Sequence, residues 1–238
     1  MLIFSPMEQY EIYTILNTNI SINNINFYLL IVLFICLIFP FLHNSKLIPN
    51  WWGVFNESLY STVLSMVINY IGPKMIIYFP LIYTIFHLIL FSNLIGMIPY
   101  SSTPTVEIVM TLTLAFTILI GVLIMGFFSH KLYLFAAFLP AGTPIGLIFL
   151  MVPLEILAYL TRTLSLGLRL AVNLITGHIL AKVLIGFIWG AYINNISLLF
   201  LSAPLFLVAL FLSLELLIAY LQAYIFTFIT CITIRDIV

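Results

Sequence analysis

One arginine stands in the middle of a long apolar stretch, where a permanent positive charge requires an explanation. Arg169 is flanked mainly by leucine, alanine and valine within residues 164–180, which read LSLGLRLAVNLITGHIL. A guanidinium stays protonated at any physiological pH, so burial cannot remove its charge. Holding such a charge inside a bilayer costs at least about 2.5–3.5 kcal/mol, which marks the residue as functional and predicts a partner for it.

Other polar residues of this stretch and of the last apolar stretch are suited to proton transfer. On a helical wheel Asn173 lies about 40° from Arg169, whereas His178 lies about 180° away. Glu215 and Gln222 are seven residues apart and share one helix face. Carboxylates and histidines take up and release protons in membranes, and amides orient water. A fixed cation repels a passing proton, so we interpret Arg169 as a barrier between two half-pathways.

A second group of charged residues is expected at the inside end of the same two stretches. It comprises Glu155, Arg162, Arg235 and Asp236. An antiparallel hairpin that turns near residues 193 and 194 would place Arg169 level with Ile218, and Glu155 within about a turn of Asp236. The sequence therefore predicts two polar clusters, one central and one at the inside end.

Each of these side chains also has a purely structural interpretation. Arg169 could form a buried ion pair with Glu215, although such a pair adds little net stability. His178 could be a hydrogen-bonded core residue, and Glu155 and Asp236 could be solvated at the membrane surface. The other basic side chains of the region could extend to the interface; they are Arg162, Lys182 and Arg235.

The composition is that of a membrane protein. Of the 238 residues, 64% are hydrophobic and 6% are charged, whereas soluble domains have about 25% charged residues. Seven basic residues balance seven acidic ones, so no basic surface for nucleic acid is expected. Several apolar runs exceed the roughly 20 residues that a helix needs to cross a bilayer. We predict an all-α polytopic membrane protein that forms one membrane domain over residues 1–238.

Polar segments divide the first half of the chain into four expected helices. A loop at 17–26 precedes the first span at 27–42. Residues 51–72 mix polar and apolar side chains after two tryptophans, which is typical of an amphipathic helix that lies in the interface. The second and third spans are expected at 75–98 and 104–128.

The last two apolar segments, 145–189 and 198–235, are too long to cross a bilayer upright. As a helix the first would be about 67 Å long, whereas the hydrocarbon core is about 30 Å thick. No Pro-rich or Gly-rich break divides it, so we predict a single, strongly tilted helix in which Pro153 could introduce a kink. The second segment should return antiparallel to it, giving about five membrane-embedded helices.

Basic residues fall in alternate flanking segments when five crossings are counted. These residues are Lys46, Lys74, Lys131 and Arg235. The positive-inside rule then places the N-terminus outside and the C-terminus inside. The N-terminus lacks the basic region of a secretory signal, although residues 1–4 could be a short leader that is removed. Cys36 and Cys231 show no metal-binding spacing, and we expect no metal and no other cofactor.

Three segments together resemble subunit a of the mitochondrial ATP synthase, in its fungal form. They are SLGLRLAVNLITGH, NLIGMIPYS and the opening FSPMEQYEI, and the resemblance extends over essentially the whole chain. It implies a static subunit of a rotary proton motor in the mitochondrial inner membrane. The implied neighbours are a ring of c subunits, the peripheral-stalk subunit b, small membrane subunits and the lipid bilayer. It also implies that Ser5 becomes the first residue after maturation.

The same resemblance implies a role for each polar residue. Arg169 would face the carboxylate of the c-ring. The half-channel from the intermembrane space would be lined by Asn173, His178, Glu215 and Gln222. Glu155 and Asp236 would belong to the half-channel toward the matrix. The chain has no P-loop, so the ATP chemistry would take place on other subunits.

Two other classes of membrane protein remain open from the residues alone. A redox-chain subunit that binds haem or quinone would need paired histidines on facing helices, and the four histidines fall one per region. A stand-alone channel or transporter often shows repeated halves or helices broken at mid-membrane, which this sequence does not show.

Overall fold

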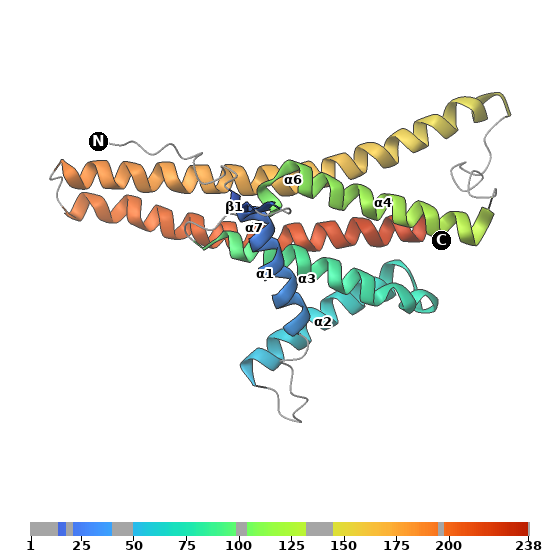
Figure 1. Ribbon diagram of the computed structural model, residues 1–238, viewed down its shortest axis with the longest axis horizontal. Helices are drawn as coiled ribbons and strands as arrows, with labels where there is room; N and C mark the ends of the chain where they lie inside the picture. The colour runs from blue at the N-terminus through green and yellow to red at the C-terminus, as the bar shows by residue number, and fades with distance from the viewer. Residues whose placement is uncertain are drawn as a thin grey trace.

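The structure, a computed structural model, describes residues 14–17, 21–39, 50–98, 104–131, 145–194 and 198–237. The leader expected at 1–4 and the expected end of the first span at 40–42 lie outside these residues. Four long apolar helices run side by side (Figure 1). They are α3 (Phe79–Gly96), α4 (Ile108–His130), α6 (Ile145–Ile193) and α7 (Leu198–Ile237). Each is long and apolar enough to cross a membrane, and the all-α polytopic fold is confirmed.

The N-terminal part differs from the expected loop. Strand β1 (Thr14–Asn17) pairs antiparallel with β2 (Ser21–Asn23), and helix α1 (Asn24–Ile38) follows at once. Both strands contain isoleucine, whose β-branched side chain favours extended backbone. The prediction of a loop at 17–26 is therefore wrong for those residues of this range that the structure describes. Helix α1 begins three residues before the expected 27, and its axis crosses those of α6 and α7 steeply (Figure 1).

Helix α2 (Trp51–Tyr70) is amphipathic and packs on the bundle. Its buried residues are Leu59, Val63, Met66 and Val67, which recur at helical spacing. The Thr227 hydroxyl of α7 lies 3.9 Å from the Met66 sulfur, which fixes one point of this contact. At the other end Trp51 and Trp52 are exposed, as an interfacial helix requires.

The start of the second span is a 3-10 helix and not the expected α-helix. Gly72 adopts a φ of 99°, and η2 (Pro73–Tyr78) leads from there into α3. Pro80 lies in the first turn of α3, where its missing N–H leaves no helical hydrogen bond unmade. An α-helix that began at residue 75 would have placed this proline in its interior, where it would clash with the preceding turn.

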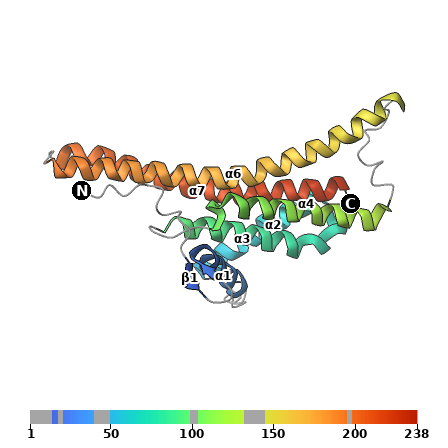
Figure 2. The same ribbon diagram turned by 45° about the horizontal axis from the view of Figure 1, so that its top comes forward.

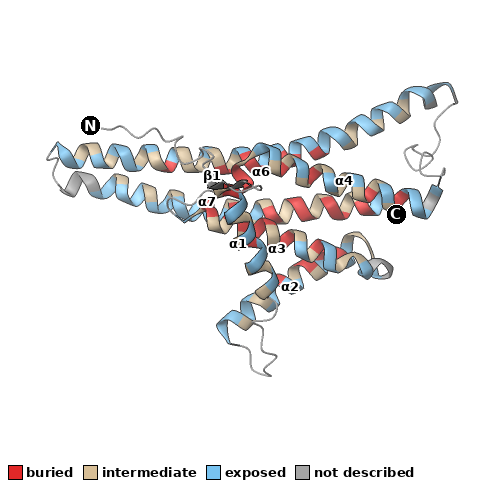
Figure 3. Cartoon of the chain, in the orientation of Figure 1, coloured by how far each residue is buried: buried red, intermediate tan, exposed pale blue. Residues whose placement is uncertain are grey.

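The core lies where α3, α4, α6 and α7 meet. Figure 3 shows the buried residues concentrated there, whereas both ends of α6 are largely exposed. Phe86 of α3 and Phe226 of α7 are almost fully buried in this core. Gly167 marks a close approach of α6 to α4, because a Cβ there would lie 3.1 Å from the Thr111 carbonyl oxygen.

Helix α6 is one unbroken helix of 49 residues, which confirms that the long apolar stretch is not two spans. At 1.5 Å per residue it is about 73 Å long, so it cannot stand upright in a bilayer core of about 30 Å. Its C-terminal part follows α7, whereas its N-terminal part turns away from α7 (Figure 1). Figure 2 shows α6 as a shallow bow with a concave outer side.

The register of the α6–α7 hairpin differs from the expected one. Glu215 lies against Gly177 and His178, whereas the expected register would place it level with Val172, at least a turn earlier on α6. The first reason is that α6 continues to Ile193 and α7 begins at Leu198, so the turn is centred later in the chain than 193 and 194. The second is that the two helices are not straight and parallel over their whole length (Figure 2).

Candidate functional site

Arg169 lies on the outer face of α6, away from the core. An adjoining face, about 60–140° around the helix from Arg169, carries Leu166, Leu170 and Leu174, which are buried at a spacing of one helical turn. Arg169 itself is exposed in this single chain. Its Nη2 donates to the Ser165 Oγ at 3.4 Å, one turn earlier. Within the described part of the chain Arg169 forms no ion pair, so a structural pair with Glu215 is not observed.

The guanidinium opens onto a broad concavity on this outer face. The concavity is shallow and wide open, and the described residues that line it lie within 161–173 of α6. Thr161, Ser165 and Asn173 contribute its other polar groups. A surface of this kind, with one permanent cation among leucines, is poorly suited to lipid and well suited to a protein partner that carries an anion.

His178 and Glu215 meet on the other side of α6, between α6 and α7. His178 Nδ1 lies 3.4 Å from Glu215 Oε1, and Glu215 is only 5% exposed. Among the described residues His178 Nε2 is buried without a hydrogen bond, and the contact with His178 is the only polar contact observed for the buried Glu215 Oε1. A buried polar atom without a partner costs about 1–3 kcal/mol, so this pair is a candidate site for proton exchange.

A narrow pocket joins Glu215 to three amide side chains. It has a volume of about 30 Å³, and its lining residues include Asn93, Asn173, Glu215 and Gln222, although the surface that they and their neighbours present to it is mostly apolar. By volume it has room for about two water molecules. Asn173 also lines the concavity around Arg169, so this one amide lies between the two spaces. The structure thus brings together Asn173, His178, Glu215 and Gln222.

Asn93 was not among the site residues predicted from the sequence. It comes from α3 and is 1% exposed. Its Nδ2 donates to the Ala219 carbonyl oxygen at 3.3 Å, and its Oδ1 is buried without a partner. The available signal was an asparagine in an otherwise apolar helix, but only the packing of α3 on α7 shows that it reaches Glu215's pocket.

Gly177 gives the Glu215 carboxyl room against the α6 backbone. A Cβ at this position would lie 2.9 Å from Glu215 Oε1 and 3.3 Å from its carboxyl carbon. We expect Gly177→Ala to displace the carboxyl, which is the end of a flexible side chain, from His178 and thereby to slow proton transport. Proton flux in vesicles that contain the assembled enzyme is the measurement.

The control for this substitution is Gly186→Ala on the same helix. A Cβ at Gly186 would have nothing within 4 Å. This variant should transport protons as the parent does. Equal transport by the two alanine variants would show that the position of the Glu215 carboxyl does not matter.

The inside-end cluster forms around Asp236. Arg162 Nη1 lies 3.8 Å from Asp236 Oδ2, and the Tyr159 hydroxyl donates to the same oxygen at 3.4 Å. The guanidinium carbon of Arg162 lies 5.3 Å from the centre of the Tyr159 ring. Glu155 is one turn before Tyr159 on α6, and Arg235 is exposed at the end of α7. Tyr159 was missed from the sequence because tyrosine is common in apolar helices.

Comparison with known proteins supplies the family. The sequence profile described as ATP synthase A chain matches residues 25–235. The chain belongs to this family. The family forms the proton channel in the stator of the ATP synthase membrane sector, so this family member is a multi-pass membrane subunit of that enzyme complex. The resemblance drawn from the sequence is confirmed, and the alternatives of a redox-chain subunit and a stand-alone channel are set aside.

Relatives named ATP synthase subunit a match this family member over nearly its whole length. The relative from Emericella nidulans is 43% identical over 98% of this chain and 96% of its own length. The relative from Podospora anserina is 44% identical over 98% of this chain and 92% of its own. The relative from Chondrus crispus is 41% identical over 99% of this chain and 96% of its own length.

Proposed function

We propose that this subunit provides two offset proton half-channels to a rotating c-ring, and that Arg169 separates them. The observation that carries this proposal is the position of Arg169. Its guanidinium is exposed on the concave face of α6 and has no carboxylate partner in the described part of the chain. The titratable pair His178 and Glu215 lies on the opposite side of the same helix.

The partner of Arg169 must then come from another protein. Facing lipid, a guanidinium would cost at least about 2.5–3.5 kcal/mol. A c-ring whose subunits each carry a carboxylate in the membrane would cover the concavity and supply the opposite charge. The attraction would keep that carboxylate ionised while it passes Arg169, and the fixed cation would repel a proton trying to cross directly.

The half-channel from the intermembrane space would run through the pocket between α6 and α7. Glu215 and His178 can take up and release a proton, and Asn93, Asn173 and Gln222 can orient water between them. Asn173 reaches from this pocket to the outer face. A proton would therefore arrive beside Arg169 and neutralise the approaching c-ring carboxylate.

The matrix half-channel would use the inside-end cluster. Asp236 is about one-third exposed and lies between Arg162 and Tyr159, and Glu155 is on the same part of α6. After nearly a full turn through lipid, a neutral c-ring carboxylic acid would release its proton here. Each proton that crosses the membrane potential supplies about 2.3 kcal/mol per 100 mV for rotation.

The proposed setting is the mitochondrial inner membrane, with the N-terminus in the intermembrane space and the C-terminus in the matrix. The alternation of basic flanking segments supports this orientation. The peripheral-stalk subunit b and small membrane subunits would hold the chain still against the ring. ATP synthesis itself would take place on other subunits, without a cofactor in this chain.

A cysteine cross-link tests whether the Arg169 face meets the ring. Val172 is exposed beside Arg169's concavity, whereas its neighbour Ala171 is fully buried. In the assembled enzyme we expect Val172→Cys to form a disulfide with a cysteine placed next to the c-ring carboxylate, and Ala171→Cys to form none. The parent chain, which contains Cys36 and Cys231, is tested in the same way to show how much cross-linking these two native cysteines give. Cross-linking from neither position, or from Ala171→Cys alone, would contradict the proposal.

A further inference from the structure

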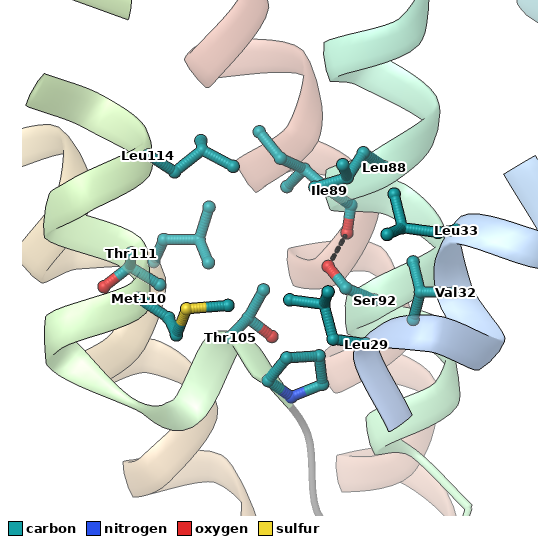
Figure 4. A pocket seen from close by; sticks show the side chains of 12 residues that line it. Leu29, Val32, Leu33, Leu88, Ile89, Ser92, Thr105, Met110, Thr111 and Leu114 are labelled. Atoms are coloured by element: carbon teal, nitrogen blue, oxygen red, sulfur yellow. Dashed lines mark hydrogen bonds between the residues drawn. The ribbon is translucent and has the colours of Figure 1, made fainter. Parts of the chain in front are cut away.

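A second cavity lies on the core side of α6 and has no part in the proposed proton path. It has a volume of about 100 Å³ and lies between α1, α3, α4 and α6, next to η3 (Pro104–Val106). Figure 4 shows its walls. Val32, Leu33, Leu88, Ser92, Thr105 and Leu170 are among the residues that line it.

The cavity presents only carbon to an occupant, although three of its residues carry hydroxyl groups. The Ser92 hydroxyl donates to the Ile89 carbonyl oxygen at 2.9 Å, as Figure 4 shows. The Thr111 hydroxyl donates to the Ile108 carbonyl oxygen at 3.1 Å. The Thr105 hydroxyl oxygen has no exposed surface and, among the described residues, no hydrogen-bond partner. Apolar cavities of this kind stay dry, so neither water nor a proton path is expected here.

The cavity is partly open, and one of the described residues that line it is exposed. This residue is Leu33 of α1, which is 38% exposed. On the same helix Leu30, Phe34 and Leu37 are 57%, 64% and 66% exposed. In a membrane such side chains face lipid acyl chains. The mouth of the cavity therefore borders the hydrocarbon region and not an aqueous phase.

We propose that the end of a lipid acyl chain enters this cavity between α1 and α4. An engineered protein cavity of about 150 Å³ lined by Leu, Ile and Phe binds benzene. The cavity described here, at about 100 Å³, is therefore large enough for the last few carbons of an acyl chain. Without an occupant, the lining side chains would lose dispersion contacts on one side. The lining also includes Leu170, which follows Arg169 on α6. A bound chain would support α6 behind Arg169 without touching the guanidinium.

Photo-labelling of the whole ATP synthase that contains this chain tests the proposal. The enzyme is reconstituted in vesicles of phosphatidylcholine that carries a diazirine at the end of one acyl chain. After illumination, labelled positions are mapped by mass spectrometry. We expect labels on the cavity residues Leu88 and Thr105, besides labels on the exposed α4 residues Ile120 and Ile124.

Two variants of α1 separate the cavity from the general lipid surface. Val32 is 2% exposed and points into the cavity, whereas Leu30 is 57% exposed. Val32→Phe should fill the cavity and lose the labels on Leu88 and Thr105 while it keeps those on α4. Leu30→Phe, the matched control, should keep both sets. Ser92→Leu fills the cavity from α3 and replaces Val32→Phe if that variant does not assemble.

The other outcomes overturn the proposal. Labels confined to the exposed residues of α4 in the parent enzyme would show that no acyl chain enters. Labels on Leu88 and Thr105 that persist in the filled variants would come from the general lipid surface.

Discussion

Replacing Arg169 with glutamine is expected to abolish ATP-driven proton pumping and to leave the enzyme assembled. A guanidinium and a carboxylate about 4 Å apart attract by about 4 kcal/mol at an effective dielectric constant of 20. Since each 1.36 kcal/mol is a factor of ten in a rate, losing that attraction should slow coupled transport by about a thousandfold. The subunit should still assemble, because Arg169 is exposed in the isolated chain and, among the described residues, its side chain bonds only to Ser165. Pumping by reconstituted enzyme is the measurement.

Two companion variants show which property of Arg169 matters. Arg169→Lys keeps a positive charge but loses the planar fork, so it should retain more pumping than Arg169→Gln and less than the parent. Ser165→Ala removes the only hydrogen bond described for the guanidinium and should leave pumping nearly unchanged. If Arg169→Gln pumped protons at the parent rate, the barrier assigned to Arg169 would not exist.

Glu215→Gln is expected to have the second-largest effect, a severe loss of proton uptake from the intermembrane-space side. The substitution keeps the shape of the side chain and removes its ability to titrate. Glu215 is 5% exposed and lies between His178 and the amide-lined pocket. Among the described residues that line this pocket, no other side chain is a carboxylate that could replace it. ATP synthesis driven by an imposed proton gradient, compared in vesicles with ATP-driven pumping, measures the effect.

The neighbouring residues provide graded comparisons for Glu215. His178→Ala should slow proton uptake without blocking it, because Glu215 and the amides would remain. Ser213→Ala is the control, since Ser213 is exposed two residues before Glu215 and bonds only to the Leu210 carbonyl oxygen among the described residues. Parent-like synthesis by Glu215→Gln would remove this carboxyl from the proton path.

The features of the hairpin that depend on one helix could be predicted from the sequence. The length of residues 145–189 without a break predicted a single helix, and the structure contains one. Helical periodicity placed His178 and Arg169 on opposite sides of it, as the structure does. Both inferences need only the helical repeat and the thickness of a bilayer.

The features that depend on contacts between helices could not be predicted in the same way. The hairpin register was wrong because the exact turn and the curvature of α6 decide which residues are level. Asn93, Gly177 and Tyr159 were not recognised, since each gains its place only through packing against α7. The short β1–β2 hairpin was missed because its strands have only four and three residues.

A density map of the assembled enzyme, resolved well enough to show the Arg169 guanidinium and the c-ring carboxylates, is the most direct measurement. The guanidinium should point from the concave face of α6 toward the ring and come within about 4–6 Å of one carboxylate, the range in which opposite charges stabilise each other. Separate aqueous spaces should reach it from the Glu215 side and from the Asp236 side. A guanidinium turned back against its own chain, or one continuous aqueous passage beside it, would contradict the role assigned to Arg169.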